Sequence, residues 1–75
     1  MNSQRAGEIA AEHGRENGLA TFSIDVVAPR TTNDGSMKRE WVVSLRFDDS
    51  ILSDIDHAIV IVDDETEVPR LIRSL

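Results

Sequence analysis

The sequence predicts an α+β fold in which one N-terminal helix packs on a three- or four-stranded antiparallel β-sheet, with residues 1–75 forming a single small domain. Three observations support this prediction. Apolar residues recur at helical spacing near the N-terminus, they alternate with polar residues in two later segments, and a third segment is apolar on both faces of an extended chain. Helix and strands are therefore segregated along the chain, which is typical of α+β domains.

Residues 4–17 are predicted to form the helix. Its apolar face consists of Ala6, Ile9, Ala10 and His13. Asn2 or Ser3 can cap the N-terminus of this helix, and Gly18 can end it in a left-handed conformation. Because Ile9 is the one large apolar residue on that face, the helix must pack against a broad surface, and its alanines suit close approach to a sheet.

Two segments with alternating polarity predict a β-hairpin. One face of the first strand carries Phe22, Ile24 and Val26, and one face of the second carries Trp41, Val43, Leu45 and Phe47. Between them, residues 30–37 form a polar, turn-rich run whose tip is Asp34–Gly35. We expect the helix to cover this face, which places Trp41 in the core.

The rest of the chain predicts a central strand and a less certain tail. Residues 57–62 alternate between two apolar faces, so this strand should be covered on both sides. An acidic turn follows, and residues 68–75 fit either a fourth, edge strand or a short helix that begins near Pro69. Residues 49–56 allow one or two helical turns.

The small size of the chain predicts self-association. The 75 residues include no cysteine and two histidines, so neither a disulfide nor a conventional structural zinc site can stabilise the domain. If the helix covers one face of the sheet, valines remain on the other. We predict a homodimer, formed through this open face or by edge-strand pairing. The valines assigned to the open face are Val27, Val42, Val60 and Val62.

The charge of the chain favours a basic protein partner. Eight basic and fourteen acidic residues give a net charge of -6, which makes free nucleic acid and anionic membranes poor partners. The predicted partner-binding residues are Asp48, Asp49, Asp63, Asp64 and Glu65. The leading hypothesis is a non-catalytic inhibitor, immunity or regulatory module that is steered by these charges. The alternative is an acidic protein that imitates a nucleic-acid backbone and blocks a nucleic-acid-binding protein.

The sequence predicts neither an enzyme nor a metal or cofactor site. His57 beside Asp56 resembles an acid/base pair, with Ser50 or Ser53 as nucleophile, but no glycine-rich oxyanion or phosphate loop accompanies it. The aspartates lack the order of a calcium-binding loop. No segment has the roughly 20 apolar residues of a membrane span, and we expect a soluble, cytoplasmic protein.

The C-terminal third resembles the PepSY-type arrangement of several small inhibitor and immunity families. In that pattern, a V-x-V-D strand leads through a Thr-Gly turn into a final strand that contains valine. The matching residues here are Val60, Val62, Asp63, Thr66 and Val68. Glu67 replaces the glycine of the turn. The resemblance implies a helix on a small antiparallel sheet, and it assigns no catalytic or binding residue.

Overall fold

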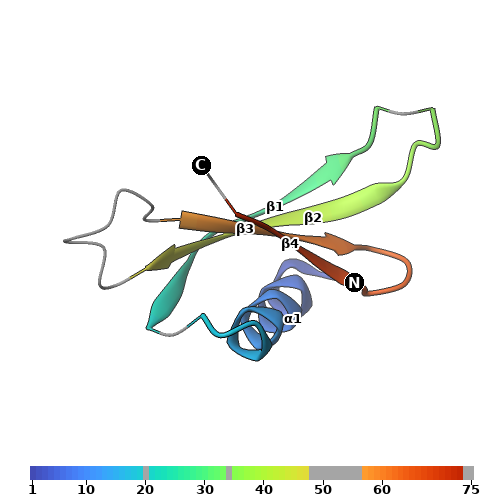
Figure 1. Cartoon of the computed structure of the whole chain (residues 1–75). Coiled ribbons are helices and arrows are strands. Elements are labelled where there is room, and N and C mark those ends of the chain that lie inside the picture. The colour runs from blue at the N-terminus through green and yellow to red at the C-terminus, as the bar shows by residue number, and fades with distance from the viewer. Residues whose placement is uncertain (20, 34, 48–56, 74–75) are drawn as a thin grey trace.

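The computed structural model describes residues 1–19, 21–33, 35–47 and 57–73 and confirms the α+β fold. The elements are α1 (Ser3–Glu16), β1 (Phe22–Thr31), β2 (Arg39–Phe47), β3 (His57–Asp63) and β4 (Pro69–Arg73). The four strands form one antiparallel sheet in the order β1-β2-β3-β4, so each strand pairs with its neighbour in sequence. Helix α1 lies across one face of this sheet (Figure 1). The tail is a strand, and the predicted helical turns at 49–56 lie outside the described residues.

Helix α1 is capped and packed through small residues. The Asn2 side-chain oxygen accepts a hydrogen bond from the Arg5 backbone N–H at 2.9 Å, as the capping prediction requires. Gly14 faces the sheet, and a Cβ atom there would lie 3.2 Å from Leu45 Cδ1 and 3.3 Å from Phe22 Cζ. The missing side chain therefore lets the helix backbone lie close to the strands.

The core lies between α1 and the central strands. Cross-strand pairing places Trp41 opposite Val62 and Val43 opposite Val60. Residues that are directly opposite share a face of the sheet, so these four side chains point together toward the helix. The buried core cluster consists of Ala6, Ile9, Ala10, Trp41, Val43, Leu45, Val60 and Val62. The prediction that Trp41 belongs to the core is confirmed.

A register shift in β1 changes which side chains face the helix. The pairing of β1 with β2 is shifted between Ile24 and Val26, where an extra residue is accommodated in β1. Ile24 pairs with Leu45 on the helix side, and Val27 pairs with Val43 on the same side. Strict alternation predicted Val26 on the helix side and Val27 on the other, and the structure reverses both placements.

The structure also corrects two of the valines assigned to the open face. Val60 and Val62 are fully buried against α1 rather than on the open face. The registers of β2 and β3 explain this, because they align these valines with the residues of β2 that face the helix. Of the four predicted valines, Val42 alone lies on the face away from the helix, since it pairs with Ala28 and Ile61.

Candidate functional site

The face of the sheet opposite α1 carries aliphatic side chains on all four strands. Figure 1 shows α1 on one side of the sheet, and no described helix or strand lies over the other. Val26 is 52% exposed and Ile72 is 43% exposed, whereas Ile61 in central strand β3 is only 4% exposed. The members of this band, called here the open-face band, are Val26, Ala28, Val42, Ile59, Ile61 and Ile72.

Charged side chains lie at both ends of the open-face band. At the end nearest the β1–β2 loop, the Arg30 guanidinium is bound to Glu40, with Nε 3.1 Å from Oε1. At the other end, His57 Nε2 lies 3.4 Å from Asp25 Oδ2. The ends of the band are therefore polar and its centre is aliphatic, which is the composition of a protein interface with a polar rim.

The open face carries equal numbers of acidic and basic residues among its Asp, Glu and Arg side chains. Alternation along the strands assigns six Asp, Glu and Arg residues to the face, three of each sign. They are Asp25, Arg30, Glu40, Arg46, Asp63 and Arg70. The chain as a whole has a net charge of -6, so its excess negative charge lies elsewhere. Two copies of this face can therefore approach each other without strong electrostatic repulsion.

The structure describes three of the five predicted acidic binding residues, and two of these three are hydrogen-bonded within the molecule. Asp48 and Asp49 lie outside the described residues. Asp63 Oδ1 accepts hydrogen bonds from the backbone N–H groups of Glu65 at 2.8 Å and Thr66 at 2.9 Å. These bonds, led by the one from Thr66, hold the pKa of Asp63 below its usual value because they stabilise the carboxylate. Asp63 therefore has a structural role in the β3–β4 turn.

Asp64 is also engaged within the molecule. Its Oδ1 accepts a hydrogen bond from the indole Nε1 of Trp41 at 2.7 Å, and the amino group of Met1 lies 3.8 Å from the same oxygen. The Arg39 guanidinium lies over the Trp41 ring, 5.8 Å from its centroid. Glu65 is exposed. Among the five predicted residues, Glu65 is thus the described one whose carboxylate accepts no hydrogen bond from another described residue.

The structure describes only part of the residues considered for catalysis or metal binding. No cluster of three or more His, Cys, Asp or Glu side chains in the described ranges is placed to hold a metal ion. His57 contacts Asp25 across the sheet, whereas its predicted partner Asp56 and the predicted nucleophiles Ser50 and Ser53 lie outside those ranges. None of the described helices is long and apolar enough to cross a membrane.

Both edges of the sheet contain features that oppose pairing with another strand. Edge strand β1 contains Pro29, which lacks a backbone N–H, and the bulge near Asp25 interrupts its register. Edge strand β4 has five residues and begins at Pro69. Short edges, prolines and bulges are the usual protection against edge-to-edge association. The open face carries no such protection.

Only part of the open-face band could be predicted from the sequence. The alternation of Ile59 and Ile61 against Val60 was visible, and it correctly predicted a central strand with two apolar faces. Choosing the covered face, however, required the register between β2 and β3, and placing Val26 required the bulge. Neither follows from periodicity.

The comparisons with known proteins give no match. No protein-family model matches the chain, and no curated protein or solved structure is significantly similar to it. The resemblance to the PepSY-type arrangement therefore stays a prediction, and the interpretation of function depends on the geometry alone.

Proposed function

We propose that the chain is a small non-catalytic protein-binding module, of the inhibitor, immunity or regulatory kind, that acts as a homodimer through the open face of its sheet. The observation that supports this most strongly is the open-face band, which spans all four strands with no described element over it. Its members on the two edge strands, Val26 and Ile72, are exposed, and exposed aliphatic side chains of a small domain are available for an interface.

The alternatives to face-to-face association are less well supported. Edge pairing is opposed by Pro29, by Pro69 and by the bulge in β1. A face-to-face dimer instead stacks two sheets about 10 Å apart and gives the protein a second apolar layer. That second layer offsets the small core of a chain of 75 residues.

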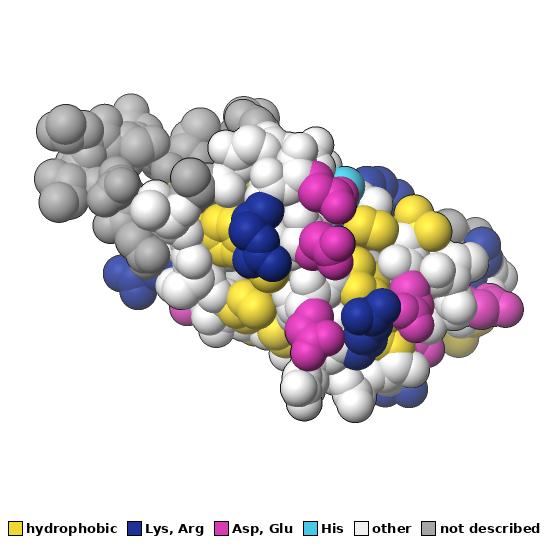
Figure 2. Space-filling model, turned by 90° about the horizontal axis from the view of Figure 1, so that it is seen from below, with side chains coloured by type: hydrophobic (Ala, Val, Ile, Leu, Met, Phe, Trp, Pro, Cys, Tyr) yellow, Lys and Arg dark blue, Asp and Glu magenta, His cyan; other side chains and the backbone are white. Residues whose placement is uncertain are grey.

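Dimerisation through the open face leaves α1 and the β3–β4 turn exposed for a partner. The exposed residues of α1 include Glu8, Glu12 and Glu16 together with Arg5 and Arg15. Figure 2, which views the molecule from the helix side, shows acidic and basic side chains next to one another on this surface. A basic protein partner is part of the proposal because of the net charge of -6. Such a mixed surface does not favour imitation of a nucleic-acid backbone.

A mixed-label NMR experiment tests the proposed interface. One half of the sample is ¹³C-labelled and the other half is unlabelled, and nuclear Overhauser effects are selected between the two. We expect contacts between methyl groups of Val26, Val42, Ile59 and Ile72 of different copies. Intermolecular contacts confined to α1, or to the backbone of β1, would show that another surface mediates association.

A further inference from the structure

One end of the open-face band carries a row of charges in the order basic, acidic, acidic. This row is called here the loop end, because it is the one nearest the β1–β2 loop, and it consists of Arg30 on β1, Glu40 on β2 and Asp63 on β3. The Arg30 guanidinium is bound to Glu40, whose side chain is 12% exposed. Lys38 lies beyond the row, outside β2. The loop end thus places two neighbouring carboxylates on the central strands.

The other end of the band carries charges of the opposite sign on β1 and β2. It is called here the His57 end and consists of Asp25 on β1, Arg46 on β2 and His57 on β3. Asp25 contacts His57, whereas Arg46 is exposed and forms no hydrogen bond or ion pair with the described residues. A cation is therefore available on β2 at this end, where the loop end has Glu40.

A face-to-face dimer with two-fold symmetry can be arranged in two ways. If the axis runs along the strands, each end lies over the same end of the other copy, and β2 lies over β3. Glu40 of one copy then lies over Asp63 of the other, twice in the dimer, so carboxylate faces carboxylate. If the axis runs across the strands, every strand lies over its own copy in the reverse direction, and the loop end lies over the His57 end.

We infer that the second copy lies on the open face end over end, with the two-fold axis across the strands, an inference that rests on the proposed dimer. This arrangement brings Arg46 of one copy to Glu40 of the other, and Arg30 of one copy to Asp25 of the other. Stacked sheets cross at about 30°, so the facing side chains are offset, and the long arginine side chains span the offset. Opposite charges at the rim orient the two copies, and the facing carboxylates disfavour the other arrangement.

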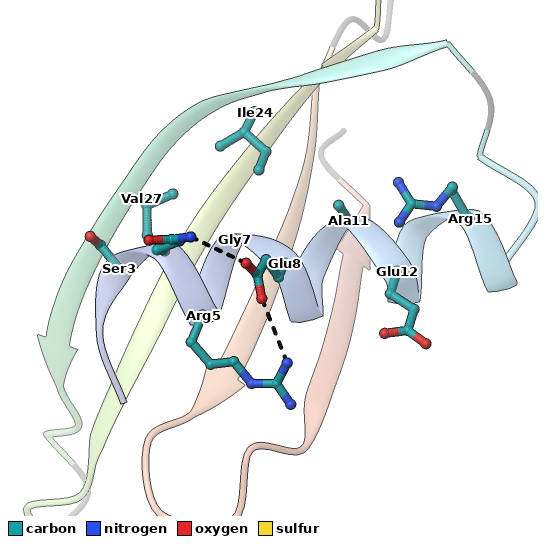
Figure 3. A pocket seen from close by; sticks show the side chains of 10 residues that line it. Ser3, Arg5, Gly7, Glu8, Ala11, Glu12, Arg15, Ile24 and Val27 are labelled. Carbon is teal, nitrogen blue, oxygen red and sulfur yellow. Dashed lines mark hydrogen bonds and ion pairs between the residues drawn. The ribbon is translucent and has the colours of Figure 1, made fainter.

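The charged residues of α1 provide a control, because they lie on the other side of the sheet. Figure 3 shows Glu8 next to Gln4 and Arg5, with 3.4 Å between Gln4 Nε2 and Glu8 Oε1 and 3.7 Å between Arg5 Nη1 and Glu8 Oε2. Arg15, further along the same helix, is exposed and has no hydrogen bond or ion pair within the described part of the chain. It therefore matches Arg46 in charge and exposure but lies away from the open face.

Charge reversal at Arg46 tests the contact between the two ends. Arg46→Glu should raise the dissociation constant of the dimer about five- to twentyfold at low ionic strength, because an attraction that occurs twice becomes a repulsion. Arg15→Glu changes the net charge equally and should alter the dissociation constant less than about twofold. Adding Glu40→Gln to Arg46→Glu should lower it again by about threefold or more, since the amide oxygen still accepts from Arg30 but carries no charge.

Sedimentation equilibrium measures these dissociation constants. A dimer that Arg46→Glu leaves unchanged or strengthens would overturn the end-over-end arrangement while leaving the open-face dimer in place. An equal loss in Arg15→Glu would overturn it as well, because the effect would then come from net charge alone.

A spin-label experiment reports the arrangement directly. The chain has no cysteine, so Met37→Cys directs a nitroxide to one position, which is 73% exposed in wild type and lies beyond the loop end. The unlabelled, nitroxide-bearing variant is mixed with the ¹⁵N-labelled unmodified chain, and broadening of amide signals is measured. We expect the strongest broadening at the His57 end of the other copy. Strongest broadening at its loop end would overturn the arrangement but keep the open-face dimer, whereas broadening confined to α1, or none, would overturn both.

Discussion

Glu67 adopts a backbone conformation that glycine favours. Its φ is +60°, in the left-handed region, at the position where the PepSY-type pattern has glycine. For a residue with a side chain this region costs about 1–2 kcal/mol. Its side chain offers partial compensation, because Oε1 accepts a hydrogen bond from Arg5 Nε at 3.1 Å. Both side chains are about half exposed, and such pairs contribute at most about 1 kcal/mol.

Glu67→Gly is therefore expected to stabilise the protein. Relief of the left-handed backbone should outweigh the lost ion pair and raise the free energy of unfolding by about 0.5–1 kcal/mol. Glu67→Ala keeps the positive φ and loses the pair, so it should lower the free energy of unfolding by at most about 1 kcal/mol. Urea denaturation of both variants measures this difference, and stability changes of the same sign would contradict the explanation.

The Asp63 carboxyl makes the stability of the folded protein depend on pH. Hydrogen bonds from the backbone N–H groups of Thr66 and Glu65 lower the pKa of this carboxyl in the folded state. A carboxyl whose pKa is lower in the folded state than in the unfolded state stabilises the folded protein at pH values above the unfolded pKa, which is near 4. This stabilisation is lost as the pH falls through the pKa of the folded state. Asp63→Asn should therefore make the free energy of unfolding less dependent on pH below about 4.

Glu65→Gln is the matched control for the Asp63 prediction. Glu65 is in the same turn, but its exposed carboxylate accepts no hydrogen bond from the described residues. Denaturant titrations between pH 2 and pH 6 should show a smaller acid-induced loss of stability in Asp63→Asn alone. If Glu65→Gln removed as much of the pH dependence as Asp63→Asn, the hydrogen bonds in the turn would not be its source.

At the scale of elements, the type and order of helix and strands were predictable but the faces of the strands were not. The capped helix, the hairpin strands and the central strand each carried a local pattern that the structure confirms. The bulge in β1 moved Val27 to the helix side, and the pairing of β2 with β3 buried Val60 and Val62. Register is a relation between segments, and a shift of one residue moves every side chain to the other face.

Alanine substitutions on the central strands test this assignment of faces. Val60 is fully buried under α1, whereas Val42 lies on the open face and is only partly buried. Val60→Ala should cost about 2 kcal/mol through lost burial and the resulting cavity, and Val42→Ala less than about 1 kcal/mol at protein concentrations that favour the monomer. Thermal and urea denaturation measure both values, and equal costs would show that the faces are wrongly assigned.

At the scale of the whole molecule, a four-stranded sheet has a helix on one side and the open-face band on the other. Two of the acidic residues that the sequence offered as a binding site, Asp63 and Asp64, form hydrogen bonds that hold the β3–β4 turn and Trp41 in place. The residues that form the candidate interface are instead aliphatic. The composition of the chain predicts an acidic surface for a partner. The aliphatic open-face band could be identified only once the registers between the strands were known.

Sedimentation equilibrium at micromolar concentration tests the proposed dimer most directly. The chain should sediment at twice its mass of 8.3 kDa. Ile72→Glu places a charge in the open-face band and should raise the dissociation constant at least about tenfold. Met37→Glu makes a similar change at a residue that is 73% exposed in the β1–β2 loop, and it should leave the dimer intact. A monomer for the unmodified chain, or a dimer that Ile72→Glu does not weaken, would contradict association through the open face.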